Sequence, residues 1–289
     1  MSEETEVTVY AIASGKGGVG KTTTTVNLGT ALAQAGERVA IVDVDLGMAN
    51  LAGFISLNAD SNTLHDVLAG DASIEEATYE LAEGIVAVPS GTDLDDYAKT
   101  SPEGLREIVE HLREEFDFVF LDVGAGVSHE TVLPLGLADA VLLVSTPEPA
   151  SIHDSSKTLE LTDRAGGAVE GLLLTRTRPE SDVSYEDVAA KVGVPLLGTI
   201  PDDPGVRDSV YAGTPLVVHD PKSPAAVAYR RLAAALAGLA PPEEEEADAA
   251  DADADGAAND ESDASDADAD RTATHDDVSS AITEAESDP

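Results

Sequence analysis

The stretch Gly15-Lys16-Gly17-Gly18-Val19-Gly20-Lys21-Thr22 matches the pattern GxxxxGK[ST]. In such a loop, backbone N–H groups surround phosphate groups, and the N-terminus of the following helix adds partial positive charge. The lysine of the pattern, Lys21, reaches the β- and γ-phosphates, and the hydroxyl of Thr22 ligates Mg²⁺. The sequence therefore predicts a nucleotide site in which the eight quoted residues and Thr23 bind the triphosphate.

The context of this loop supports the prediction. Residues 7–13 (VTVYAIA) are apolar and β-branched, which is typical of a buried strand. Residues 22–35 have a helical pattern that ends at Gly36. A chance match in a glycine-rich loop is the alternative, and a strand before and a helix after the loop argue against it.

Strand-like and helical segments alternate up to about residue 240. Six further apolar runs predict strands at 37–44, 85–89, 116–123, 140–145, 171–175 and 194–200. Helices are predicted at 101–115, 151–165 and 224–239. This alternation predicts an α/β fold with a mostly parallel, twisted sheet and helices on both faces.

Composition excludes several classes of protein. The 289 residues include no cysteine, which rules out disulfides and cysteine-ligated iron–sulfur clusters. No apolar run is long enough to span a bilayer, and the N-terminus MSEETEVTVY is acidic, unlike a signal peptide. We therefore expect a cytoplasmic protein.

The formal net charge of −41 is extreme, and only part of it lies near the C-terminus. Residues 241–289 carry −18 and residues 1–240 carry −23. At molar salt the Debye length falls to about 3 Å, which removes most of the self-repulsion of such a domain. We interpret the charge as adaptation to a salt-rich cytoplasm of the haloarchaeal kind; an ordinary acidic protein is the alternative. A large nucleic-acid interface is not expected.

The chain divides near Ala240. Residues 1–240 are predicted to form the nucleotide-binding domain. Residues 241–289, rich in Asp, Glu, Ala and Ser, cannot bury enough apolar surface to offset their ordering entropy, so we expect a disordered acidic tail. Val278, Ala281, Ile282 and Ala285 have helical spacing, which leaves open a short partner-binding helix or an accidental pattern.

The additional lysine of the loop narrows the class. The segment KGGVGKTTTT, which begins at Lys16, resembles the deviant Walker A motif of the MinD/ParA family of ATPases. The resemblance implies a P-loop fold of the SIMIBI type and an ATP-dependent homodimer. In that family the first lysine reaches the nucleotide of the other subunit, which implies a catalytic role for Lys16. A solvated loop charge is the alternative.

Aspartates follow two further predicted strands. Residues 43–51 (DVDLGMANL) resemble the first switch segment of the family, DxDxGxxNL. On that match Asp45 orients or deprotonates the attacking water and lies close to the metal, while Asp43 and Asn50 support the site. These aspartates could instead cap the following turn. The run FDFVFLD ends at Asp122, which predicts a Walker B aspartate that holds Mg²⁺ through a water.

Three later motifs extend the resemblance over residues 7–240. Gly124-Ala125-Gly126 resembles the second switch segment, although Gly124 stands where the family usually has proline. The family signature IPxDxxVxxSxxxGxP begins at Ile200, and the resemblance places Arg176 and Pro201 beside the adenine. The guanine-specific [NT]KxD motif does not occur at Thr175-Arg176-Thr177-Arg178, which favours ATP over GTP.

The resemblance is stronger to the MinD branch, and to its archaeal members, than to chromosome-partitioning proteins. It implies a slow, partner-stimulated ATPase with ATP and Mg²⁺, acting as a switch that positions a division site, a motility or chemosensory array, or a chromosome. The other reading is a regulatory ATP-binding module with negligible turnover. The acidic segment after Leu239 does not resemble a basic membrane-targeting helix, so any membrane or polar recruitment needs an unidentified protein partner.

Overall fold

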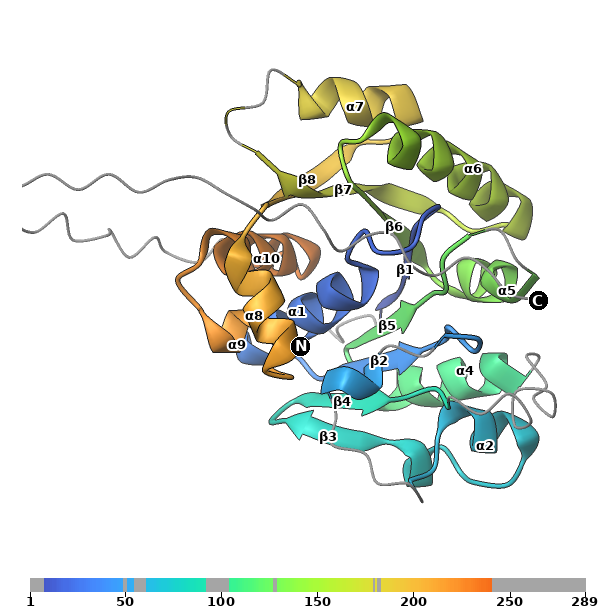
Figure 1. Ribbon diagram of the computed structural model, residues 1–289. Coiled ribbons are helices and arrows are strands. Elements are labelled where there is room, and N and C mark those ends of the chain that lie inside the picture. The colour runs from blue at the N-terminus through green and yellow to red at the C-terminus, as the bar shows by residue number, and fades with distance from the viewer. Residues whose placement is uncertain are drawn as a thin grey trace, which may run out of the picture. The chain divides into compact units, whose positions relative to one another are not determined.

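A computed structural model describes residues 8–48, 51–54, 61–91, 104–126, 129–178, 180 and 183–240. These residues contain an eight-stranded sheet with the order β3-β4-β2-β5-β1-β6-β7-β8 (Figure 1). The strands are β1 (Thr8–Ala13), β2 (Val39–Asp43), β3 (Tyr79–Ala82), β4 (Ile85–Val88), β5 (Phe118–Asp122), β6 (Ala140–Ser145), β7 (Val169–Thr177) and β8 (Leu196–Pro201). All neighbouring strands are parallel except β3 and β4, which are antiparallel.

Helices cover both faces of the sheet (Figure 1). One face carries α1 (Lys21–Gln34), α8 (Pro204–Tyr211), α9 (Leu216–His219) and α10 (Pro224–Leu236). The other carries α4 (Leu105–Glu115), α5 (His129–Leu137), α6 (Pro149–Ala165) and α7 (Tyr185–Val192). The short helix α2 (Leu64–Ala69) follows the single-turn helix η1 (Leu51–Phe54), and a second such helix, η2 (Glu75–Ala77), precedes β3.

Successive residues of each central strand belong to two different cores. In β1, Val9 and Ala11 pack into the core beneath α4 and α5, whereas Tyr10 and Ile12 pack into the core beneath α1 and α10. Side chains on a strand alternate between the two faces, so a strand that is covered on both faces must be apolar throughout. This explains the unbroken apolar runs of the sequence and confirms the predicted fold class.

The sequence did not predict several short elements. Strand β3 and helices α2, α5, α7, α8 and α9 were not expected, whereas the predicted strands and longer helices are present with ends shifted by a few residues. Helix α5 contains Pro134, which obscures its helical pattern. Strand β3 is a half-exposed edge strand of only four residues.

Residues 241–289 lie outside the described part of the chain, so their predicted disorder stays a prediction. Asn50 of the first switch segment also lies outside the described residues, so its predicted role in supporting the site stays a prediction. Within the described residues, none of the helices combines the length and apolar character needed to cross a lipid bilayer.

Candidate functional site

The glycine-rich loop joins β1 to α1, in the middle of the sheet. Gly18 and Gly20 have φ angles of 75° and 99°, a backbone conformation that residues with a Cβ atom rarely adopt. Gly20 is the N-cap of α1, so Lys21 begins the helix. The Ser14 hydroxyl donates a 2.8 Å hydrogen bond to the Lys16 carbonyl. The glycines therefore permit the sharp turn that brings the loop to the positive end of α1.

Strand β7 and helix α6 hold this loop from outside. The Thr175 hydroxyl donates to the Val19 carbonyl (2.7 Å), and the Arg176 guanidinium donates to the Gly18 carbonyl (2.7 Å). Arg176 has a φ of 53°, the left-handed conformation that is uncommon for residues other than glycine. A Cβ atom on Gly15 would lie 2.2 Å from the backbone oxygen of Asp154 in α6. Only glycine allows this close approach of loop and helix.

Two buried carboxylates lie side by side at the carboxyl ends of β2 and β5. Asp43 and Asp122 are register partners on these neighbouring strands and are 0% and 2% exposed. The carboxylate of Asp43 accepts hydrogen bonds from the backbone amides of Asp45 (3.1 Å) and Leu51 (3.0 Å). Asp43 therefore organises the loop that follows β2.

The electrostatics of this pair are unusual. Burial, together with the neighbouring Asp43 carboxylate, raises the pKa of Asp122 to about 7, although a hydrogen bond from Thr22 and the charge of Lys21 oppose the shift. Burial also lowers the pKa of the Lys21 ammonium, and Asp122, Asp45 and Asp43 oppose this change. A cation between the two strands and the loop would compensate the carboxylates, so the chemistry of the donors favours a metal–phosphate ligand.

Asp45 lies at the edge of this site and is only partly buried. Its carboxylate accepts a 3.1 Å hydrogen bond from the Met48 amide. It also packs against Gly124: a Cβ atom there would lie 3.1 Å from the Asp45 carboxylate carbon. The glycine that replaces the usual proline of the second switch segment therefore makes room for Asp45.

Lys16 lies on the surface. Its side chain is 47% exposed, and its ammonium is 3.6 Å from the carboxylate of Glu148, which is 66% exposed. An exposed pair at this distance is weak, so the Lys16 ammonium can leave it at little cost.

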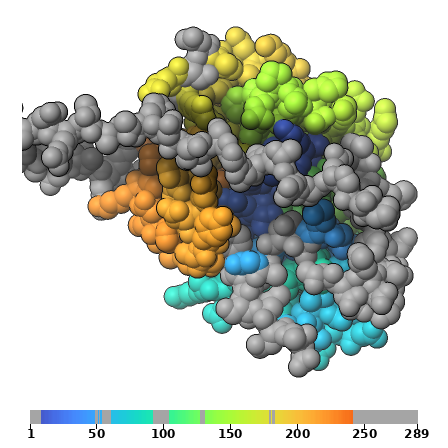
Figure 2. All heavy atoms as spheres, in the orientation of Figure 1, coloured from blue at the N-terminus to red at the C-terminus, as the bar shows by residue number. Residues whose placement is uncertain are grey.

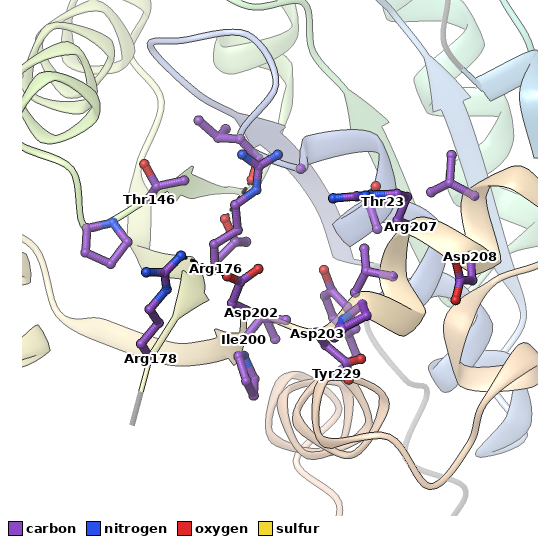
Figure 3. A pocket seen from close by; sticks show the side chains of 18 of the residues that line it. Thr23, Thr146, Arg176, Arg178, Ile200, Asp202, Asp203, Arg207, Asp208 and Tyr229 are labelled. Atoms are coloured by element: carbon purple, nitrogen blue, oxygen red, sulfur yellow. Dashed lines mark hydrogen bonds and ion pairs between the residues drawn. The ribbon is translucent and has the colours of Figure 1, made fainter. Parts of the chain in front are cut away.

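A cavity of about 1200 Å³ opens beside the loop. Figure 3 shows Arg176, Arg178 and Asp202 on one side of it and Arg207 and Asp208 of α8 on the other. Its lining also includes Val19, Gly20 and Thr23 from the loop region and Pro201 at the end of β8. In the space-filling view, the dark-blue N-terminal segment is visible between the orange atoms of the C-terminal helices and the green atoms above them (Figure 2).

The structure brings the predicted site residues together. The loop residues, Thr22, Asp45 and Asp122 meet at the carboxyl ends of the strands, and Arg176 and Pro201 line the adjoining cavity. The role of Arg176 beside a base stays a prediction, because its guanidinium here contacts Gly18. The described residues contain no group of three His, Asp or Glu side chains that could hold a metal alone.

Sequence reasoning missed the residues that support the site from behind. Ser90 donates a 2.6 Å hydrogen bond to the Asp43 carbonyl, and Thr25 of α1 lies 3.5 Å from the Asp122 carboxylate. Ser90 belongs to none of the motifs named above, and Thr25 is the last residue of KGGVGKTTTT but had no predicted role there. Ser90 and Gly91, directly after the apolar run at 85–89, were the available signal for Ser90, because they mark the carboxyl end of a parallel strand.

Comparison with protein families gives one match that covers most of the chain. Residues 10–216 match the model of the CobQ/CobB/MinD/ParA nucleotide-binding domain. An uncharacterised ATP-binding protein of Methanocaldococcus jannaschii is 40% identical over 229 residues, which cover 79% of this chain and 87% of that protein. The septum site-determining protein MinD of Synechocystis is 32% identical over 238 residues and 80% of this chain, and 89% of that protein is covered.

Solved structures of similar sequence have the same fold. MinD of Pyrococcus horikoshii, complexed with Mg-ADP, has a TM-score of 0.74 and 37% sequence identity, over 80% of this chain and 96% of that one. MinD in the MinC:MinD complex of Aquifex aeolicus has a TM-score of 0.73 and 29% identity, over 82% of this chain and 98% of that one.

Proposed function

This chain belongs to the CobQ/CobB/MinD/ParA family of nucleotide-binding domains, and from that premise we propose that it is a MinD-like ATPase that switches between monomer and ATP-bound homodimer. Its task would be spatial positioning inside the cell, performed through a protein partner. The observation that carries the proposal is the exposed Lys16 beside an otherwise complete phosphate site.

The site residues fit ATP and Mg²⁺. The loop from Gly15 to Thr22 and the helix end behind it suit the phosphates, and Lys21 supplies a cation to the β- and γ-phosphates. Thr22 and Asp122 would hold Mg²⁺ with phosphate oxygens, and the ion would neutralise phosphate charge. The cavity beside Arg176 and Pro201 is large enough for a nucleoside. The Mg-ADP bound to the Pyrococcus relative supports this ligand class.

Asp45 is the residue best placed to orient the attacking water. It is partly exposed at the edge of the site, and the Met48 amide and the neighbouring Gly124 define the place of its carboxylate. A carboxylate in this position can accept a proton from water or align it with the phosphorus.

Lys16 is the residue that would require a second subunit. Because its ammonium forms an exposed, solvent-screened pair with Glu148, it is available to a phosphate group of a facing copy of the chain. A positive charge there would stabilise the charge that develops during phosphoryl transfer. Hydrolysis would then depend on dimer formation.

The test is size-exclusion chromatography and phosphate release in molar KCl, with Mg-ATP or Mg-ADP. Wild-type protein should form a dimer with Mg-ATP but not with Mg-ADP, and it should hydrolyse the ATP slowly. Asp45→Ala should accumulate as the ATP-bound dimer, Lys16→Ala should bind ATP without turnover, and Lys21→Ala should lose ATP binding. A Lys16→Ala protein that hydrolyses ATP at the wild-type rate would refute the dimer-dependent mechanism.

The alternative, a regulatory ATP-binding module, predicts ATP binding with negligible turnover even when a partner is present. Low basal turnover does not separate the two, because a partner can stimulate hydrolysis. The relative in the MinC:MinD complex supports the search for a protein partner. Fluorescent tagging of wild-type and Asp45→Ala protein in the native host, followed by capture of the trapped dimer, would identify the cellular position and the partner.

A further inference from the structure

His65, near the start of α2, is buried and has hydrogen bonds at both ring nitrogens. It is 1% exposed. Its Nδ1 accepts a 2.7 Å hydrogen bond from the backbone amide of Gly91, and its Nε2 lies 3.1 Å from the Leu46 carbonyl oxygen. Because the amide can only donate, Nδ1 is unprotonated and Nε2 carries the hydrogen that binds Leu46. The ring therefore joins the segment after β4 to the segment after β2.

The surroundings hold the ring in this place. Asp66 caps the start of α2, where its carboxylate accepts from both the amide (2.7 Å) and the hydroxyl (2.8 Å) of Thr63. The Leu64 amide donates to the Pro89 carbonyl at 2.8 Å, which attaches the helix to the end of β4. A Cβ atom on Gly91 would lie 3.0 Å from Nδ1 of His65, so glycine allows this approach without displacing the ring. The position of His65 is thus defined by both neighbouring segments.

The contact with Leu46 matters because Leu46 directly follows Asp45. The other side of Asp45 is held through Asp43, whose carboxylate accepts from the Asp45 amide and whose carbonyl accepts from Ser90. Ser90 and Gly91 are adjacent, so one short segment after β4 supports the loop on both sides of Asp45. Ser90 acts directly on Asp43, and Gly91 acts through the His65 ring.

We propose that His65 is a positioning residue for hydrolysis: its Nε2–H holds the Leu46 carbonyl and thereby keeps the carboxylate of Asp45 in place for the attacking water. The inference rests on the proposed ATPase function. His65 is not a catalytic residue, since both ring nitrogens bond to backbone groups. A merely structural histidine in the core would change stability alone, whereas a positioning residue also lowers the kcat of the folded protein, at unchanged ATP affinity.

Two substitutions separate the two hydrogen bonds of the ring. In His65→Gln the side-chain amide nitrogen reaches the place of Nε2 and keeps the donor to Leu46. In His65→Asn the amide oxygen reaches the place of Nδ1 and keeps the acceptor for Gly91, but the side chain is too short to reach Leu46. The pair is therefore matched in polarity: His65→Gln keeps only the contact to Leu46, and His65→Asn keeps only the contact to Gly91.

The expected result is a loss of kcat in His65→Asn of about 10-fold or more, with KM for ATP changed by less than about 2-fold. His65→Gln should retain kcat within about 3-fold of wild type. Gly91→Ala, which pushes on the ring without altering it, should lower kcat as His65→Asn does, and it serves as a second variant if His65→Asn fails to fold. Equal losses in the Gln and Asn variants, or wild-type kcat in His65→Asn, would overturn the proposal.

Hydrogen–deuterium exchange gives a readout that does not depend on turnover. The amides of Asp45, Met48 and Leu51 are hydrogen-bonded within the loop and report its order. In nucleotide-free protein they should exchange faster in His65→Asn than in wild type, and at the wild-type rate in His65→Gln. If wild-type protein shows no ATPase activity even with a partner present, the proposed function fails, and these exchange rates alone decide whether His65 positions Asp45. Equal exchange in all three proteins contradicts the proposal.

Discussion

Asp43 and Asp122 bring two negative charges together inside the protein, at the point where a metal–phosphate ligand would bind. They are register partners on β2 and β5 and are almost completely buried. Burying a carboxylate beside another is unfavourable unless a proton or a cation compensates the charge. The charge of this pair is therefore uncompensated when the site holds no ligand, and a bound cation would compensate it.

This uncompensated charge predicts a pH dependence of stability. The pKa of Asp122 is raised to about 7 in the folded protein from 3.8, mainly by burial. A group whose pKa rises on folding binds more protons when folded, so its contribution to stability is greatest below about pH 4 and declines as the pH rises to about 7. Nucleotide-free Asp122→Asn should therefore gain stability relative to wild type as the pH increases.

Thermal unfolding of both proteins between about pH 5 and pH 8, in molar KCl without nucleotide, checks this. All other titrating groups are common to the two proteins, so the difference between their melting temperatures reports on Asp122 and its interaction with Asp43. A difference that stays constant over this pH range would contradict the raised pKa.

Gly124 determines where the carboxylate of Asp45 can lie. A methyl group at position 124 would approach the Asp45 carboxylate carbon to 3.1 Å and displace it. The carboxylate needs to move by only a few tenths of an ångström, and a misplacement of about 1 Å can cost about 100-fold, so Gly124→Ala should lower kcat by up to about 10-fold and leave ATP affinity nearly unchanged. Steady-state phosphate release and ATP titration measure the two quantities.

Gly198→Ala is the control for Gly124→Ala. An added methyl group at position 198 meets only ordinary van der Waals contact, with Leu173 at 3.7 Å. It should leave kcat as in wild type. If both alanine variants keep the wild-type kcat, the Asp45 carboxylate does not depend on the space that Gly124 provides.

At the scale of elements, the phosphate-binding loop depends on segments distant in sequence. Thr175 and Arg176 of strand β7 donate hydrogen bonds to carbonyl groups of the loop, and helix α6 packs against Gly15. Thr175 and Arg176 of β7 also line the cavity, as do Pro147 and Glu148 directly before α6. A ligand in the cavity that moves the Arg176 side chain would therefore alter the support of the loop.

The contact of the loop with α6 leads to a matched pair of substitutions. Gly15→Ala would place its methyl group 2.2 Å from the Asp154 carbonyl oxygen, whereas Gly17→Ala meets only the Ala125 side chain, at 4.0 Å. Gly15→Ala should therefore lower the free energy of unfolding by about 1–3 kcal/mol, the usual cost of overpacking. Gly17→Ala should change it by less than about 0.5 kcal/mol. Guanidinium unfolding of the nucleotide-free proteins compares them, and equal stabilities would rule out a tight contact.

At the scale of the whole molecule, charge is the dominant property. Residues 1–240 carry −23 and residues 241–289 carry −18. Such charges repel over about 10 Å at 0.1 M salt and over only about 3 Å at 1 M. Stability should therefore increase with salt concentration over this range.

Removal of residues 241–289 tests whether the charge of this segment repels that of residues 1–240. The truncated protein should fold and bind ATP, because the deleted segment is too polar to belong to the core. It should reach its maximal melting temperature at lower KCl than the full chain, but should still need salt because −23 remains. Melting temperatures between about 0.1 and about 3 M KCl measure this. Identical salt profiles would mean that the two parts do not repel each other.

Limited proteolysis of the full chain tests the predicted disorder of residues 241–289. Disordered segments are cleaved readily, so rapid loss of this segment with retention of the remaining domain is expected. Resistance to cleavage would contradict the prediction. If the protein without residues 241–289 is positioned normally in cells, the tail has no role in positioning, and a solubilising role is the remaining interpretation.

The sequence by itself determined the phosphate-binding loop, the class of fold and the aspartates at the strand ends. These features depend on residues close together in the chain: glycines that permit a turn, apolar runs that must be buried on both faces, and polar residues directly after them. The short element α2 and the edge strand β3 could not be predicted, because four to six residues carry too little periodicity.

Only the tertiary structure decided which of these residues meet. Asp43 and Asp122 became neighbours because β2 pairs with β5, and Arg176 reached Gly18 across 158 residues because β6 brings β7 to the loop. The same holds for His65, whose ring joins Gly91 to Leu46. Such contacts arise from strand order and packing, which one sequence does not encode as a local pattern. The segment around Asp45 therefore contacts residues, such as His65 and Ser90, that no motif contains.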